Sequence, residues 1–243
     1  MKGLLILMLF CLAGCATKGE GDPRDPFEGW NRGVYKFNDK LDEYVARPVA
    51  TGYRRAIPGE IRDRVRNFFG NIGDVFTGVN NFLQGKFADG ANDWARVAFN
   101  TTIGILGIHD VATDMGYEKH DEDFGQTFGR WGASSGPYLV LPVLGSSTVR
   151  DGLGKTLDIY TDPINETEPF GVRWGVAALR LTQTRADLLD ASRILEEAAL
   201  DRYVFQRDAY LQRRRSLIYD GHAPRQRDPE DESETKNDGK KPD

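Results

Sequence analysis

The stretch from residue 123 to residue 142, DFGQTFGRWGASSGPYLVLP, is rich in both glycine and aromatic residues. Its glycines, together with one just beyond it, are Gly125, Gly129, Gly132, Gly136 and Gly145. Glycine permits positive φ angles and close approach of two backbones, whereas Pro137 and Pro142 bracket an extended apolar run that cannot propagate a helix. The spacing is not that of an ordinary amphipathic helix. We therefore predict a glycine-jointed hairpin carrying apolar residues, framed by helices elsewhere in the chain.

The first long helix is predicted to start at Asp25-Pro26-Phe27-Glu28, with aspartate as the cap, proline at the first helical position and glutamate three residues after the cap. Large apolar residues then recur every three or four positions: Phe27, Trp30, Val34, Phe37, Leu41 and Tyr44. Packing in a protein core is one interpretation of this face. Its unusually aromatic character also suits contact with acyl chains or a membrane interior.

The same spacing of apolar residues, every three or four positions, predicts further helices along the chain. Their approximate ranges are 48–58, 61–83, 87–102, 149–162, 172–189 and 200–218. Ser146-Ser147-Thr148 is expected to cap the fourth of these, and Gly221 to follow the last. Signals for strands are nearly absent outside the hairpin. We predict a mostly α fold with one short extended hairpin, in which no apolar run approaches the roughly 20 residues of a transmembrane helix.

The N-terminus has the pattern of a bacterial lipoprotein signal. A basic start, Met1-Lys2, precedes an apolar segment and then Leu12-Ala13-Gly14-Cys15, small residues directly before a cysteine. We predict a signal peptide over residues 1–14, acylation of Cys15 with chains such as palmitate, and a tether over 15–24. Because Cys11 leaves with the signal, disulfides and cysteine-ligated zinc are excluded. Ala16, in place of an aspartate, favours the outer membrane.

Composition assigns the rest of the chain to one helical domain, residues 25–221, and a charged disordered tail, residues 222–243. The formal net charge is −5. We interpret the one basic cluster, Arg213-Arg214-Arg215, as a solvated helix face. Nucleic acid is therefore not an expected partner.

Motifs for catalysis and metal binding are discounted. Residues 132–136, GASSG, match G-x-S-x-G, but the strand and helix that a nucleophile elbow requires are not predicted around them. The acidic run 118–123 reads as a solvated loop rather than a metal site. Phosphate-binding and dinucleotide motifs do not occur, and the chain has three histidines. We predict a protein that is not an enzyme and uses no cofactor.

Several segments in order resemble the MlaA/VacJ family of outer-membrane phospholipid-transport lipoproteins. They are residues 25–32 (DPFEGWNR), 37–39 (FND), 47–50 (RPVA), 80–85 (NNFLQG), 122–127 (EDFGQT), 136–142 (GPYLVLP) and 150–151 (RD). The resemblance covers about residues 25–221. It implies a ring of amphipathic helices embedded in the inner, periplasmic leaflet of the outer membrane. It further implies an amphipathic channel that passes mislocalised outer-leaflet phospholipids to a periplasmic carrier, MlaC, and association with trimeric porins.

Two sets of residues are candidates for the lipid path. A conduit needs polar groups beside an apolar wall, and the first helix offers both. Its candidates for lining a channel are Phe37, Asn38, Asn31 and Arg32. The hairpin is predicted to be mobile and to govern lipid passage, with Gly132 and Gly136 as hinges. Its gating candidates are Gly136, Pro137, Tyr138, Leu139, Val140, Leu141 and Pro142.

Two alternatives stay open at this level. The hairpin could be a static loop buried in the core. The chain could also be a structural lipoprotein that clasps a porin or another envelope protein without transporting lipid.

Overall fold

The computed structural model describes residues 22–198 and 200–224. The predicted signal peptide, Cys15 and nearly all of the predicted tail lie outside these ranges. The elements are α2 (Glu28–Leu41), the π-helical turn η1 (Asp42–Ala46), α3 (Arg47–Ala56), α4 (Gly59–Leu83), α5 (Phe87–Thr102), α6 (Val111–Asp114), α7 (Phe124–Arg130), β1 (Tyr138–Leu141), β2 (Gly145–Thr148), α8 (Val149–Thr161), the 3-10 turn η2 (Pro163–Glu166), α9 (Phe170–Asp187), α10 (Leu189–Ala198) and α11 (Arg202–Ile218). The predicted fold class, mostly α with one short hairpin, is confirmed.

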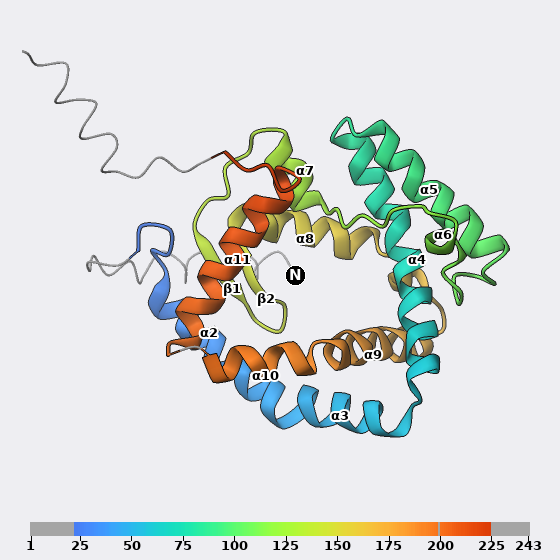
Figure 1. Ribbon diagram of the computed structural model, residues 1–243. Coiled ribbons are helices and arrows are strands. Elements are labelled where there is room, and N and C mark those ends of the chain that lie inside the picture. The colour runs from blue at the N-terminus through green and yellow to red at the C-terminus, as the bar shows by residue number, and fades with distance from the viewer. Residues whose placement is uncertain (1–21, 199, 225–243) are drawn as a thin grey trace, which may run out of the picture.

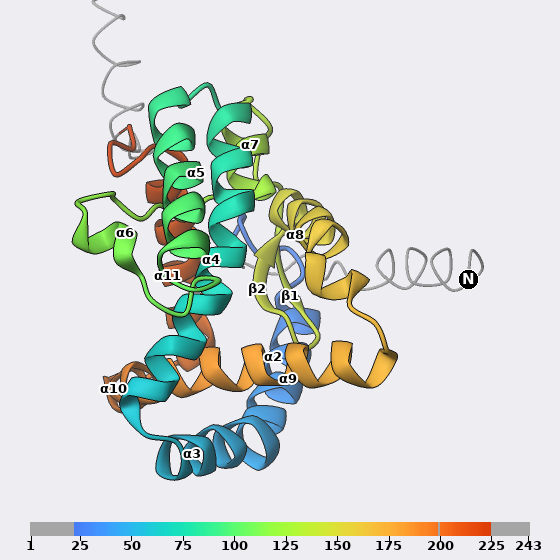
Figure 2. The same ribbon diagram turned by 90° about the vertical axis from the view of Figure 1, so that its right-hand side faces the viewer.

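The helices follow one another around a ring (Figure 1). α2 and α3 form one side, α4 rises opposite α11, and α7 with α8 closes the top of the view. α9 returns along α3 and packs against it, and α5 packs along the outer side of α4. The β1–β2 hairpin lies inside the ring. Seen edge-on, α6, α10 and α11 lie toward one face, whereas the hairpin and α8 lie toward the other (Figure 2).

The glycine-rich stretch is only partly a hairpin. Its first half forms the short helix α7, which we did not predict, and the Asp123 carboxylate caps this helix by accepting a bond of 2.8 Å from the Gln126 amide. Gly125 serves close packing rather than a turn. A Cβ at Gly154 of α8 would lie 2.3 Å from the Gly125 nitrogen, so only glycine at position 154 lets the two helices approach this closely.

The second half forms the predicted hairpin. β1 and β2 pair in antiparallel register from Tyr138 opposite Thr148 to Leu141 opposite Gly145. The turn contains Val143, whose φ of 67° is unusual for a β-branched residue. Thr148 caps α8 as expected, accepting a bond of 3.2 Å from the Asp151 amide, whereas the two serines before it belong to β2.

The start of α2 differs from the prediction. The N-cap is Phe27, and the Asp25 side chain makes no capping bond. Asp25 is instead 2% exposed and bonds to side chains far along the sequence.

Polar residues occupy much of the interior of the described chain, while many large apolar residues are exposed. Fully buried side chains include Asn31, Asn80, Asn81, Asp93 and Arg96. Large apolar side chains at least half exposed occur on most of the longer helices and include Trp30, Phe37, Tyr44, Phe87, Trp94, Leu153, Tyr160, Phe170, Trp174, Leu181 and Ile194. Within the described residues, the helices are all too short or too polar to cross a membrane.

Candidate functional site

A cavity of about 580 Å³ lies inside the ring beside the hairpin. α2 and η1 form one wall, the start of β2 another, and α9, α10 and α11 the remainder. The lining residues from α2 to α3 and the hairpin are Tyr35, Asn38, Asp39, Asp42, Arg47, Gly145 and Ser146. Those from α9 to α11 are Arg185, Leu188, Ser192, Arg202, Phe205, Gln206, Ala209, Tyr210 and Arg213.

One face of α11 supplies much of this lining. Arg202, Gln206, Ala209 and Arg213 follow a spacing of four, three and four residues, which places them along one helical stripe. Phe205 and Tyr210 flank that stripe with aromatic surface, and Leu188 adds apolar surface from beyond the end of α9. The cavity therefore combines charged groups with apolar wall, as an amphipathic ligand requires.

Asp42 holds an ion-pair cluster at one end of the cavity. Its carboxylate accepts bonds from Arg185 at 2.5 and 2.8 Å and from Arg47 at 3.3 Å. Burial acts to raise the pKa of Asp42, but the bonds and charges of Arg185 and Arg47 outweigh it, so the pKa lies below its usual range. The extra residue that a π-helical turn inserts rotates the faces of the helix that follows it, and Asp42 begins that turn. The cluster is consequently ionised and internally paired.

Two asparagines of α2 hold the hairpin. The Asn31 amide donates to the Tyr138 carbonyl at 3.0 Å and accepts from the Val140 amide at 2.8 Å. Seven residues on, Asn38 donates to the Leu141 carbonyl at 2.9 Å and accepts from the Val143 amide at 2.8 Å. Each side chain thus replaces a backbone partner along the open edge of β1.

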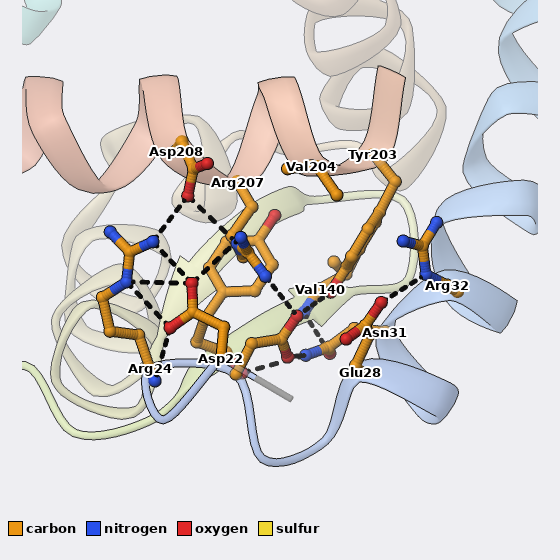
Figure 3. Close-up of polar contacts among 12 residues, drawn as sticks. Asp22, Arg24, Glu28, Asn31, Arg32, Val140, Tyr203, Val204, Arg207 and Asp208 are labelled. Atoms are coloured by element: carbon orange, nitrogen blue, oxygen red, sulfur yellow. Dashed lines mark hydrogen bonds and ion pairs between the residues drawn. The ribbon is translucent and has the colours of Figure 1, made fainter. Parts of the chain in front are cut away.

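A buried polar network fixes α11 against the same region (Figure 3). Asp25 accepts a bond of 2.7 Å from Asn31 and a further bond from the Tyr203 hydroxyl. Burial first, and then the Asp25 carboxylate, raise the pKa of Tyr203, which remains protonated as the donor. Arg207 lies 3.0 Å from Asp22 and 3.6 Å from Asp25. The first described residues are thereby tied to the last long helix.

The four predicted channel residues have different surroundings. Asn38 lines the cavity. Asn31 has no exposed surface, so direct contact with a lipid does not fit its burial, and its bonds indicate that it positions the hairpin. Arg32 pairs with Glu28 at 2.7 Å and Asp201 at 2.9 Å and does not line the cavity. Phe37 is 54% exposed and lies outside the cavity lining.

The hairpin has a buried side and an exposed tip. Tyr138 and Val140 are buried in a cluster with Val34 and Tyr203, so half of the predicted apolar run is core. Leu139 and Leu141 are half-buried. The exposed apolar residues are those of the turn, Val143 at 60% and Leu144 at 48%, and sequence reasoning missed them.

Sequence reasoning also missed the contribution of α11. The cluster Arg213-Arg214-Arg215 is not simply a solvated face, because the Arg214 side chain is only 11% exposed and bonds to Asp123 and Asp151. The spacing of Arg202, Gln206 and Arg213 on one helical face was the available signal. The acidic run 118–123 is likewise paired in part, since Lys86 contacts Glu122 at 2.9 Å.

Within the described ranges, no cluster of histidine, cysteine or acidic residues is arranged to hold a metal ion. The GASSG segment follows helix α7 and leads into an extended loop, so the elbow geometry does not form around Ser134.

A second cavity of about 230 Å³ lies between α7, α8 and α11. It is lined by Asp158 and Lys155 among others. Burial raises the pKa of Asp158 to about 6, although a bond of 3.2 Å from the Phe124 amide acts against this. Lys155 reaches from the same wall toward the hairpin, with its ammonium 3.4 Å from the Leu144 carbonyl.

Comparison with known proteins agrees with this geometry. Residues 23–217 match the family model described as MlaA lipoprotein. The chain belongs to the MlaA lipoprotein family. It is 37% identical over 227 residues to the intermembrane phospholipid transport system lipoprotein MlaA of Escherichia coli K12, covering 90% of this chain and 88% of that protein. The MlaA protein of Shigella flexneri is equally similar.

A solved member of the family has the same fold. That structure, described as the structural basis for maintenance of bacterial outer membrane lipid asymmetry, matches with a TM-score of 0.70 at 34% identity. The match covers 80% of this chain and 98% of the other. The resemblance noted in the sequence is therefore confirmed, and the fold is one that the family shares.

Proposed function

We propose that this MlaA-family protein removes mislocalised phospholipids from the outer leaflet of the outer membrane and so maintains lipid asymmetry. The observation that carries the proposal is the amphipathic cavity inside the ring, closed on one side by the hairpin. Charged groups there suit a head group, and the aromatic and aliphatic wall suits acyl chains. The names of the family relatives support the same substrate class.

Membrane embedding is proposed from the exterior of the ring. The many exposed aromatic and aliphatic side chains exceed what a soluble monomer normally presents to water, and they suit burial in one leaflet. Acylation of Cys15 would provide the anchor, and the network around Asp22 and Asp25 would fix the domain directly beyond the tether. We place the ring in the periplasmic leaflet.

Lipid passage would be governed by the tip of the hairpin. Asn31 and Asn38 hold β1 through the Val140 amide and the Leu141 carbonyl. Movement is therefore assigned to the exposed turn, where release of the Asn38 bond to the Val143 amide would free Val143 and Leu144, rather than to the whole run 136–142. The strained φ of Val143 is consistent with a segment that has a second conformation. From the cavity, lipid would pass to a periplasmic carrier of the MlaC type, and a trimeric porin would associate with the ring.

Copurifying lipid tests this proposal against the scaffold alternative. The protein is purified in detergent from its own membranes, and bound phospholipid is quantified by mass spectrometry. A conduit retains phospholipid, and Ala209→Trp, which fills part of the cavity, lowers retention severalfold. Ala98→Trp, at an exposed position on α5 away from the cavity, is the control and retains the wild-type amount. A lipid-free wild-type protein would favour a scaffold that only clasps a partner.

A further inference from the structure

We infer that the cavity selects glycerophospholipids with a zwitterionic, amine-bearing head group. Arg202 binds the phosphate and Asp39 binds the ammonium group. This inference rests on the proposed function, because it assigns the head-group preference of the same site. It follows from which charges in the cavity are already paired and which are available.

Most charges of the lining are satisfied within the protein. Asp42 pairs with Arg185 at 2.5 Å and with Arg47 at 3.3 Å. At the far end of the α11 stripe, Arg213 lies 3.8 Å from Asp121. A ligand that approached Asp42, Arg185 or Arg47 would have to break an existing ion pair, so these groups offer little net attraction.

Asp39 and Arg202 differ from that cluster. Within the described part of the chain, neither side chain makes a hydrogen bond or an ion pair, although both line the cavity. Among the described lining residues, Asp39 and Arg202 are therefore an anion and a cation that a ligand can reach without breaking an ion pair. Because both charged side chains line the cavity without a bond of their own among the described residues, each can make a charge-assisted bond to a ligand.

A neighbouring ion pair fixes Arg202 beside α2, the helix that carries Asp39. Arg32 of α2 binds Asp201, 2.9 Å apart, and this contact holds the start of α11 against α2. Arg202 is the residue directly after Asp201. Asp39 lies seven residues after Arg32, hence two turns further along the same face of α2. The pairing thus holds Arg202 against α2 about two turns before Asp39, and both residues line the same cavity.

The chemistry of the two available charges matches a phosphoethanolamine head group. Its phosphate and ammonium are joined by a two-carbon linker and carry opposite charges, so one can meet Arg202 while the other meets Asp39. Phosphatidylglycerol offers only the phosphate, and it would bring a second anion toward an unpaired Asp39, which is unfavourable. Selectivity therefore comes from Asp39, whereas Arg202 contributes affinity for either lipid.

Competition between two lipids with identical acyl chains tests this assignment. The full-length protein in detergent is mixed with equimolar phosphatidylethanolamine and phosphatidylglycerol, and retained lipid is quantified after gel filtration. We expect the wild type to enrich phosphatidylethanolamine about fivefold, the effect of roughly one charge-assisted bond at a partly exposed site. Asp39→Asn should return the ratio close to the input, and Arg202→Gln should lower retention of both lipids.

Matched controls are exposed residues away from the cavity. Asp114→Asn on α6 and Arg130→Gln at the end of α7 should leave both the ratio and the amount unchanged. Retention of both lipids at the input ratio by the wild type, or an unchanged ratio in Asp39→Asn, would overturn the head-group assignment while leaving the proposed function intact. Retention of neither lipid by the wild type would overturn both.

Discussion

At the scale of single residues, the hairpin is placed by two asparagines of α2. Asn31 bonds to Tyr138 and Val140, and Asn38 bonds to Leu141 and Val143. Seven residues of helix advance about 10.5 Å, and three residues of strand advance about 10 Å. The spacing of the asparagines therefore matches the strand that they hold. Their role is to position backbone, which no short sequence motif announces.

Replacing Asn31 should destabilise the protein strongly. Asn31→Ala removes the side-chain partner of the Tyr138 carbonyl and of the Val140 amide, and it removes one of the bonds to the buried Asp25 carboxylate. We expect a loss of about 2–4 kcal/mol in the free energy of unfolding. Denaturant titration in detergent measures it. Asn92→Ala, which removes one bond to the Glu118 carbonyl at a less buried position, should cost below about 1 kcal/mol. Equal losses for the two variants would refute the positioning role.

Asp158 should make stability depend on pH. Its pKa is about 6 when folded against an ordinary 3.8, so between these values the folded protein holds a proton that the unfolded chain has lost. The stabilisation by the neutral carboxyl is present at low pH and disappears as pH rises through 6. Asp158→Asn stays neutral and can keep the bond from the Phe124 amide.

The stability of Asp158→Asn relative to the wild type should therefore increase from pH 4 to pH 8. At pH 8 we expect its free energy of unfolding to exceed that of the wild type by about 1.5 kcal/mol. This is half of the value that the whole pKa shift implies, because the carboxyl is partly exposed. Unfolding of both proteins at the two pH values measures the gain. Asp114→Asn, at an exposed position on α6, is the control substitution. A pH-independent effect of Asp158→Asn would contradict a buried neutral carboxyl.

At the scale of elements, the glycines near the centre of the chain do two different things. Gly132 and Gly136 adopt φ of 94° and 64°, as expected for joints in an extended loop. Gly125 and Gly154, by contrast, lie on α7 and α8 where two helix backbones touch. The sequence predicted the first use, because a turn is local. The second use, close contact between helices, could not be predicted in this way because it depends on which helix packs against α7.

Two glycines of α8 provide a matched test of that contact. A Cβ at Gly154 would meet the Gly125 nitrogen at 2.3 Å, whereas a Cβ at Gly152 would meet the Ser147 hydroxyl at an ordinary 3.6 Å. Gly154→Ala should therefore cost about 3 kcal/mol or more through backbone displacement. Gly152→Ala should instead stabilise by about 0.5–1 kcal/mol through helix propensity. Thermal unfolding ranks them, and a tolerated Gly154→Ala would show that α7 and α8 are not packed this closely.

Locking the hairpin tip tests its mobility. Asn38 bonds to the Val143 amide, so residues 38 and 143 are neighbours and form the pair to replace by cysteine. If Cys15 is acylated, the introduced thiols are the only free ones in the mature chain. We expect oxidation of Asn38→Cys/Val143→Cys to raise phospholipid in the outer leaflet, and reduction to restore it. Each single cysteine variant is the control. A locked, correctly localised protein with normal asymmetry would make the tip part of the scaffold.

Local patterns predicted the helices well and their partners poorly. The apolar rhythm over 61–83 and 87–102 corresponds to α4 and α5, and the Thr148 cap begins α8 as expected. Asp25, however, has every feature of a helix cap and instead bonds to Tyr203, which lies 178 positions away. Such a pairing depends on the closed ring. The cavity was missed for the same reason, because its walls come from α2, α9 and α11.

At the scale of the whole molecule, the distribution of polarity is the central feature. Polar side chains such as Asn80, Asp93 and Arg96 fill much of the described interior, and large apolar side chains lie on the outside. Buried polar groups are tolerated here because nearly all are bonded; the Arg96 guanidinium, for example, contacts Asp74 and Asp110. A ring with an apolar exterior and an amphipathic cavity suits a protein that conducts lipid while seated in a leaflet.

The most direct test of this account is the amount of phospholipid in the outer leaflet of living cells. Intact cells are treated with an amine-reactive reagent that does not cross the membrane, and labelled phosphatidylethanolamine is quantified. Deletion of the gene should raise the labelled fraction, the wild-type gene should return it to its original level, and Ala209→Trp should not. An unchanged labelled fraction after deletion, or full restoration by Ala209→Trp, would contradict the proposal that lipid leaves the outer leaflet through this cavity.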